Sequence, residues 1–130
     1  IETVESLQSI VRPQCRYSWS LNVLENASKK NMITKSGLML GLGERKKEVI
    51  ETMRHLAEIN CQVLSIGQYL RPSRRHLEVV EYIEPETFSE YKAIGLSLGI
   101  RHVEAGPLVR SSYRADQQTK NLVGFLPKQT

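Results

Sequence analysis

Two adjacent serines flanked by arginines lie near the end of this sequence, in GPLVRSSYRADQQ at residues 106–118. A serine oxygen can serve as a nucleophile, as a hydrogen-bonding group or as a metal ligand. A hydrolase of the GxSxG type would place its serine in that turn, with an acid and a histidine following in order, and this pattern is absent. The alternative interpretation is a polar turn in which Ser111 and Ser112 bond the backbone.

A glycine-rich turn is the second candidate site, in GLMLGLGE at residues 37–44. Glycines let the backbone approach a ligand, and the N–H groups at the start of a helix favour an anion or the polar edge of a cofactor. The segment has neither the GxGxxG pattern nor a Walker lysine, so it does not indicate a dinucleotide or triphosphate site. The alternative is an ordinary strand-to-helix turn in which Glu44 complements the helix dipole.

A basic segment is the third candidate, in GQYLRPSRRH at residues 67–76. Its cationic and titratable side chains are Arg71, Arg74, Arg75 and His76. Such a group can hold a carboxylate or a phosphate, and His76 is a candidate acid or base with no identified partner. The alternative is a solvated loop that Pro72 keeps extended.

Hydrophobic periodicity predicts the elements that position these three segments. We expect helices at residues 3–11, 17–30, 44–60 and 85–98, buried strands at 34–40 and 62–70, and a third short strand at 101–109. Alternating strands and helices favour an α/β fold with parallel strands and crossover helices. Ligands in such folds gather at the carboxyl ends of the strands, where all three candidate segments would lie.

Three parallel strands make a poor sheet on their own, because two faces and two edges need covering. The pattern therefore indicates a portion of a larger (β/α) barrel or open α/β sheet. We expect residues 1–118 to form that portion and residues 119–130 to form a tail. The sequence opens with Ile1 rather than methionine, which also suggests an excerpt of a longer protein.

Composition limits the function classes. The 130 residues are 40% apolar with a net charge of +4, which argues against disorder. No apolar run reaches the roughly 18 residues of a membrane span. The mild basic charge fits nucleic acid, an acidic protein, an anionic small molecule or simply a solvated surface. Cys15 and Cys61 have no metal-ligand spacing, so we expect buried thiols and a reducing compartment.

Taken together, TKSGLMLGLGE, IGQYLRPSRRHL and GPLVRSSY, in this order and preceded by IETV, resemble lipoyl synthase. The resemblance runs from Ile1 to about Gln118. It implies the C-terminal part of a partial (β/α)6 TIM-like barrel of the radical S-adenosylmethionine superfamily. In this family one [4Fe–4S] cluster cleaves S-adenosylmethionine to a radical, and a second cluster donates two sulfur atoms to an octanoyl chain on a lysine of a carrier protein.

The resemblance also implies roles for single residues. Ser112 is the expected catalytic residue and metal ligand, because a serine of the RSSY motif binds the sulfur-donating cluster in the family. Its bond to iron would be more readily broken than a thiolate bond. The expected S-adenosylmethionine contacts are Gly41, Gly43, Glu44, Gln68 and Tyr69.

Both cysteine motifs that hold the clusters in the family are absent, and Cys15 and Cys61 match neither in spacing. We therefore expect this chain to be inactive alone. The implied partners are an octanoylated carrier protein, which the arginine-rich loop would face, and ferredoxin or flavodoxin as electron donor, without nucleic acid or membrane. The complete enzyme is expected to be a monomer in the bacterial cytoplasm, with a mitochondrion or plastid as alternatives. The competing functions are a noncatalytic basic binding module and an inactive barrel remnant.

Overall fold

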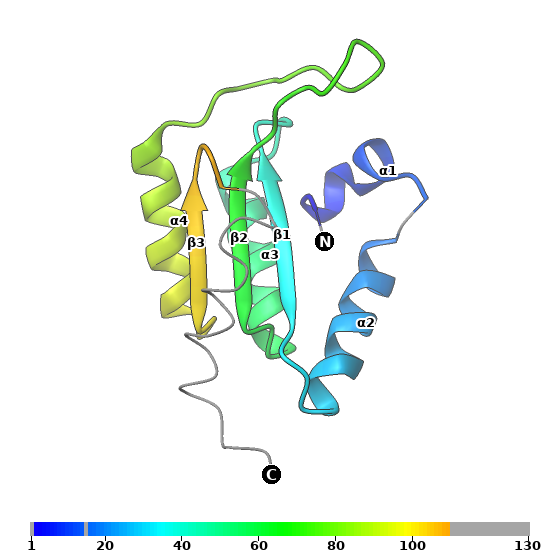
Figure 1. Cartoon of the computed structure of the whole chain (residues 1–130), viewed down its shortest axis with the longest axis vertical. Coiled ribbons are helices and arrows are strands. Elements are labelled where there is room, and N and C mark those ends of the chain that lie inside the picture. Colours follow the sequence, from blue (N-terminus) through cyan, green and yellow to red (C-terminus); the bar gives the residue numbers. More distant parts are fainter. Residues whose placement is uncertain (1, 15, 110–130) are drawn as a thin grey trace.

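Three parallel strands form the centre of the molecule. The computed structural model describes residues 2–14 and 16–109. Strands β1 (Lys35–Leu40), β2 (Val63–Gln68) and β3 (His102–Gly106) pair in the order β1-β2-β3, and both pairings are parallel (Figure 1). The α/β class and the parallel arrangement predicted from the sequence are confirmed.

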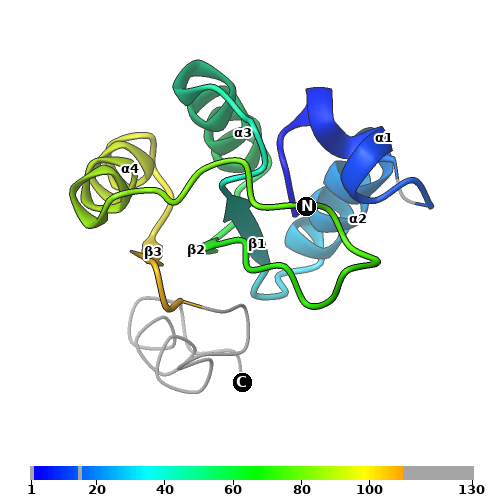
Figure 2. The same ribbon diagram turned by 90° about the horizontal axis from the view of Figure 1, so that it is seen from above.

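Helices cover one face of this sheet. The two crossover helices, α3 (Lys46–Glu58) and α4 (Pro85–Ser97), lie side by side on the same face (Figure 2). Helix α2 (Tyr17–Lys29), with the short η1 (Glu5–Leu7) and α1 (Gln8–Val11), lies beside the β1 edge. Helices on one face are typical of a barrel wall, whereas an open doubly wound sheet has them on both. Within the described part of the chain, no helix has the length and apolar character needed to cross a membrane.

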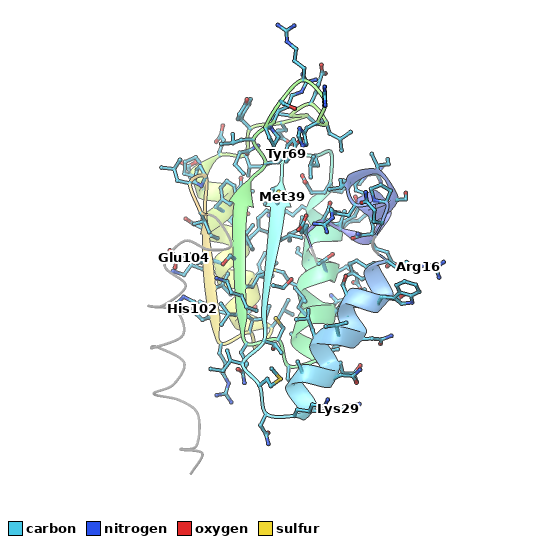
Figure 3. The ribbon with its side chains drawn as sticks, turned by 45° about the vertical axis from the view of Figure 1, so that its right-hand side comes forward. Arg16, Lys29, Met39, Tyr69, His102 and Glu104 are labelled. Atoms are coloured by element: carbon cyan, nitrogen blue, oxygen red, sulfur yellow. The ribbon has the colours of Figure 1, made fainter. Side chains whose placement is uncertain are left out.

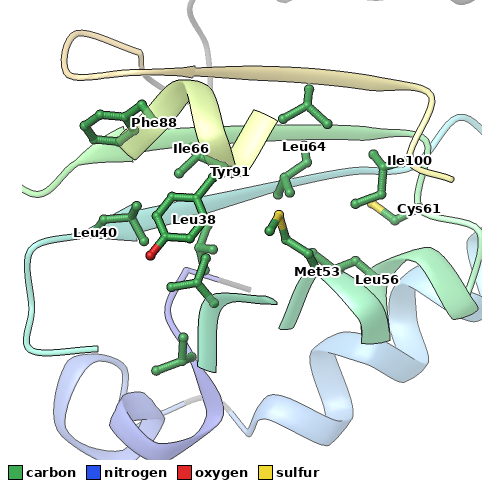
Figure 4. Packing of buried hydrophobic residues seen from close by; sticks show 13 residues of the cluster. Leu38, Leu40, Met53, Leu56, Cys61, Leu64, Ile66, Phe88, Tyr91 and Ile100 are labelled. Atoms are coloured by element: carbon green, nitrogen blue, oxygen red, sulfur yellow. The ribbon is translucent and has the colours of Figure 1, made fainter. Parts of the chain in front are cut away.

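The hydrophobic core fills the space between the sheet and helices α3 and α4 (Figure 4). Its largest fully buried side chains include Leu40, Met53, Leu56, Leu64, Ile66, Phe88 and Ile100. They alternate along the strands and recur at helical spacing along α3 and α4, which is the pattern that places them on one side of each element. This packing fixes the carboxyl ends of the strands relative to one another.

The strands differ in how their two faces are buried. Every residue of β2 is buried, as predicted for a central strand. Residues of β1 alternate between buried and half-buried, and in β3 only Val103 is buried. The prediction of a buried strand at 34–40 is therefore correct in position but wrong for the face of the sheet opposite α3 and α4. The short strand predicted at 101–109 is present but ends at Gly106.

The N-terminal segment continues the sheet rather than starting a helix. The carbonyl of Glu2 accepts a hydrogen bond of 2.9 Å from the backbone N–H of Met39, on the free edge of β1. Val4 has extended dihedral angles and is buried in the core. The helix predicted for residues 3–11 ends at Val11 as expected but begins only at Glu5, because these contacts hold Val4 in an extended conformation. Only a 3₁₀ turn and one short α-helical segment follow.

Candidate functional site

The turn after β1 lies at the carboxyl edge of the sheet, as the sequence predicted. Gly41 and Gly43 have φ angles of 97° and 104°, a region that residues with a side chain rarely adopt. Helix α3 begins only at Lys46, two residues later than predicted. Arg45, in extended conformation, precedes it and donates its N–H to the Glu48 carboxylate at 2.9 Å, which fixes this start.

Glu44 closes this turn on itself. Its carboxylate accepts hydrogen bonds from the backbone N–H of Gly41, at 2.9 and 3.2 Å, and of Leu42, at 3.1 Å. Burial raises the pKa of Glu44, although these hydrogen bonds oppose the shift and the charge of Glu81 adds to it. Burial and the neighbouring charge of Glu44 also raise the pKa of Tyr91 to about 12. The carboxylate organises the turn and is partly removed from solvent.

Gln68 joins the carboxyl end of β2 to a distant part of the chain. Its side-chain amide nitrogen donates to the carbonyls of Tyr69 and Glu81, both at 3.0 Å, and its oxygen accepts from the N–H of Ile83 at 2.8 Å. The carbonyl of Gly41 accepts from the N–H of Val80 at 2.8 Å. The segment 80–83 therefore crosses the ends of β1 and β2, held by both.

Tyr69 is the first residue beyond β2 and is buried. Its backbone N–H donates to the carbonyl of Leu40 at 2.7 Å, which extends the strand pairing by one step. Its hydroxyl donates to the carbonyl of Leu77 at 2.7 Å. Tyr69 thus ties the base of the arginine-rich loop to the sheet, and Figure 3 shows it at the end of β2 near Met39.

The five residues expected to contact S-adenosylmethionine meet at this edge, since the turn, Gln68 and Tyr69 contact one another or the same segment. The polar side-chain atoms of Glu44, Gln68 and Tyr69 already have partners within the protein. Their contact with a cofactor stays a prediction. Ser111, Ser112 and the rest of the RSSY segment lie outside the described residues.

The face of the sheet opposite α3 and α4 carries a polar row that the sequence reasoning missed. The strand register places Gly37, Ser65 and Glu104 side by side, on the face opposite the core residues of the same strands. The Ser65 hydroxyl is buried and has no hydrogen-bond partner in the described part of the chain. His102 Nε2 lies 3.7 Å from Glu104 Oε2 (Figure 3). The sequence signal that could have revealed this row is the alternation of polar and apolar residues in HVEAG.

The described residues do not by themselves fit an iron–sulfur cluster. No group of three histidine, cysteine or acidic side chains that could hold a metal occurs in residues 2–14 and 16–109. Cys61 is buried just before β2, at the end of the sheet opposite the candidate site, with its sulfur 3.4 Å from the carbonyl of Val63. Burial raises the pKa of its thiol, and the buried position predicted from the sequence is confirmed for Cys61, whereas Cys15 lies outside the described residues.

These features define an α/β protein with parallel strands, helices on one face and a candidate ligand site at the carboxyl edge. No protein-family model matches the chain. Comparison with curated proteins gives a lipoyl synthase of Caldanaerobacter subterraneus subsp. tengcongensis, 53% identical over 118 residues, which are 89% of this chain and 42% of that protein. The lipoyl synthase of Treponema denticola is 53% identical over 117 residues, covering 90% of this chain and 40% of its own length.

A lipoyl synthase of Rubrobacter xylanophilus is 50% identical over 123 residues, or 93% of this chain and 38% of that protein. The chain thus spans about two fifths of the length of the curated relatives it matches. The resemblance to lipoyl synthase that the motifs indicated is confirmed for this portion.

Proposed function

We propose that this chain is the part of a lipoyl synthase that builds the carboxyl edge of its last strands. The reaction is the insertion of two sulfur atoms into an octanoyl chain on a lysine of a carrier protein. The observation that carries the proposal is the identity of at least half of the aligned residues with three lipoyl synthases, over about nine tenths of the chain. The gathering of Gly41, Glu44, Gln68 and Tyr69 at one edge of the sheet supports it.

The proposed cofactors are S-adenosylmethionine and two [4Fe–4S] clusters, which supply the radical and the sulfur when bound. The cysteines that hold the clusters would come from residues outside this chain, and Ser112 would contribute one ligand. Gly43 is the exposed glycine of the turn, and a Cβ atom built on it would meet nothing closer than a Val80 methyl at 3.9 Å. This open backbone fits a cofactor edge better than Gly41, which is enclosed.

The proposed partners are an octanoylated carrier protein and a ferredoxin or flavodoxin as electron donor. The bacterial cytoplasm is the proposed location, since these relatives are bacterial, and a monomer is the proposed state of the complete enzyme. We expect the chain alone to be inactive, because the sequence lacks both cysteine motifs that hold the clusters in the family.

The test is a substitution of each serine in the full-length protein. After anaerobic reconstitution, Ser112→Ala is expected to lower the yield of sulfur-inserted product by more than about tenfold, as measured by mass spectrometry. Mössbauer spectra should show an altered iron site in the sulfur-donating cluster. Ser111→Ala is the matched control and should retain activity.

Unchanged sulfur insertion by Ser112→Ala would remove this residue from the mechanism. A full-length wild-type protein that binds no cluster and forms no product would contradict the proposed function. That result would favour the alternative function, a noncatalytic basic binding module.

A further inference from the structure

The arginine-rich loop, residues 70–78, projects beyond the carboxyl edge of the sheet (Figure 1). Arg71 organises it from within. Its guanidinium donates to the carbonyl of Arg74 at 2.7 Å and to those of Ser73 and His76, both at 3.0 Å. One side chain therefore holds three backbone carbonyls of the same loop, which fixes the loop's course.

Three further contacts complete this internal network. The Ser73 hydroxyl accepts from the N–H of Arg75 at 3.2 Å and lies 2.8 Å from His76 Nδ1. The Tyr69 hydroxyl holds the loop's return at the carbonyl of Leu77. A loop that is ordered before a partner arrives loses little conformational entropy on binding, so its exposed side chains are preorganised for recognition.

Arg74 and Arg75 are the exposed cations of this loop. Their guanidinium groups have no hydrogen-bond or ion-pair partner among the described residues, whereas Arg71 lies 3.6 Å from the Glu78 carboxylate. Two adjacent unpaired arginines on an ordered backbone attract a carboxylate-rich surface, and arginine forms paired hydrogen bonds with carboxylates.

Exposed apolar side chains occur in the same loop and in the residues just after it. Leu70, Leu77, Val80 and Tyr82 are all exposed, and Tyr82 shows 70% of its surface. Exposed aromatic and aliphatic side chains beside arginine are typical of protein interfaces. The combination fits an acidic protein better than a nucleic acid.

We propose that the loop at residues 70–78, with Val80 and Tyr82, is the docking surface for an acidic protein. If the proposed function holds, that protein is the octanoylated carrier, and in this respect the inference rests on the proposed function. The loop is anchored through Tyr69 to the same strand end as the candidate cofactor site. Docking there delivers a side chain of the partner to the carboxyl edge of the sheet.

The test compares two substrates in the full-length reconstituted protein: an octanoylated carrier domain and a short octanoyl-lysyl peptide that lacks the carrier surface. The double variant Arg74→Glu/Arg75→Glu is expected to raise KM for the carrier domain more than about tenfold. Its kcat with the carrier and its kinetics with the peptide should match the wild type. Lys29→Glu/Lys30→Glu makes the same charge change at the far end of α2 (Figure 3) and should leave both substrates unaffected.

The variant Arg71→Gln separates the effect of loop order on binding from the effect of the exposed charges. It removes the internal donors while Arg74 and Arg75 stay in place, so we expect a smaller rise in KM for the carrier domain and faster amide hydrogen exchange in the loop. The neutral pair Arg74→Gln/Arg75→Gln should give an intermediate KM. This neutral pair replaces Arg74→Glu/Arg75→Glu as the test variant if the charge reversal prevents folding.

The proposal is overturned if KM for the carrier domain is the same in the wild type, in Arg74→Glu/Arg75→Glu and in Arg74→Gln/Arg75→Gln. It is also overturned if the loop binds a duplex or single-stranded oligonucleotide and the carrier does not bind. If the wild type forms no product with either substrate, the proposed function fails. Calorimetric titration of the carrier domain into the wild type and the loop variants then still decides whether the surface binds it.

Discussion

The side-chain amide of Gln68 occupies the space in which any side chain at position 41 would stand. A Cβ atom built on Gly41 would lie 2.3 Å from Gln68 Nε2 and 2.4 Å from the carbonyl oxygen of Glu81. The same amide holds the segment 80–83 across the strand ends. The conformation of the turn and the path of segment 80–83 therefore both require that position 41 has no side chain.

Gly41→Ala is expected to destabilise the protein by about 3 kcal/mol or more. Alanine would be strained at a φ of 97°, at a cost of about 1–2 kcal/mol, and would also displace an amide that makes three hydrogen bonds. Urea unfolding measures the loss. Gly99→Ala is the matched control, since Gly99 has a φ of 105° but no atom within 4 Å of its Cβ position, so only the strain remains. Equal losses in the two variants would contradict this account.

The raised pKa of Glu44 gives stability a defined dependence on pH. Burial disfavours the ionised form of Glu44 in the folded protein. Its contribution to the free energy of unfolding is therefore largest at pH values below 4.5, the ordinary pKa of a glutamate. It falls as the pH rises from there through the raised pKa. Glu44→Gln removes this titration while keeping an oxygen acceptor for the turn. We therefore expect the stability difference, wild type minus variant, to decrease over that interval.

Urea unfolding of both proteins at a series of pH values measures this difference. Glu44→Ala is the control for lost hydrogen bonds. It leaves the N–H groups of Gly41 and Leu42 without their acceptor and should be less stable than Glu44→Gln by about 1–3 kcal/mol. A stability difference between wild type and Glu44→Gln that grows with pH would show that the hydrogen bonds, and not burial, dominate the titration.

The sequence was sufficient for the parts of the fold that local periodicity determines. The apolar runs between glycines placed β1 and β2 to within two residues, and Pro85 marked the first turn of α4. The strand-to-helix alternation gave the parallel sheet. The Gly41 turn was also located correctly, because glycines between an apolar run and an amphipathic helix have few other uses.

Contacts between distant segments could not be predicted. Gln68 reaches residues 81 and 83, and no local pattern encodes a hydrogen bond across fifteen positions. Glu44 was assigned to the helix because its bonds to the preceding N–H groups are invisible in a hydropathy pattern. Arg71 was counted as one more cation, although its guanidinium is directed into its own loop. The role of Ser112 stays a prediction that rests on resemblance.

Cys61 is expected to be unreactive in the folded protein. It is 2% exposed, its sulfur lies near two backbone carbonyls, and burial raises its pKa, so little thiolate forms and little of it is accessible. Alkylation with iodoacetamide at pH 8, followed by mass spectrometry of the peptide that contains Cys61, measures the rate. We expect labelling at least about 100-fold slower than in urea, where the thiol is free. Comparable rates in the two conditions would show that the end of α3 opens readily.

Gly95 packs α4 directly against β3. A Cβ atom there would lie 3.0 Å from a Val103 methyl and 3.4 Å from the Met53 sulfur. Alanine would favour the helix by about 1 kcal/mol, whereas overpacking costs about 1–3 kcal/mol. Gly95→Ala is therefore expected to lose about 1 kcal/mol net.

A double-mutant cycle tests this cause directly. In a Val103→Ala background the crowding methyl is absent, so Gly95→Ala should become neutral or stabilising, with a coupling energy of at least about 1 kcal/mol. Lys92→Ala, at an exposed position of the same helix, should be additive with Val103→Ala. Additivity of Gly95→Ala with Val103→Ala would mean that α4 can shift away from β3. The spacing between α4 and the sheet would then be set elsewhere in the core.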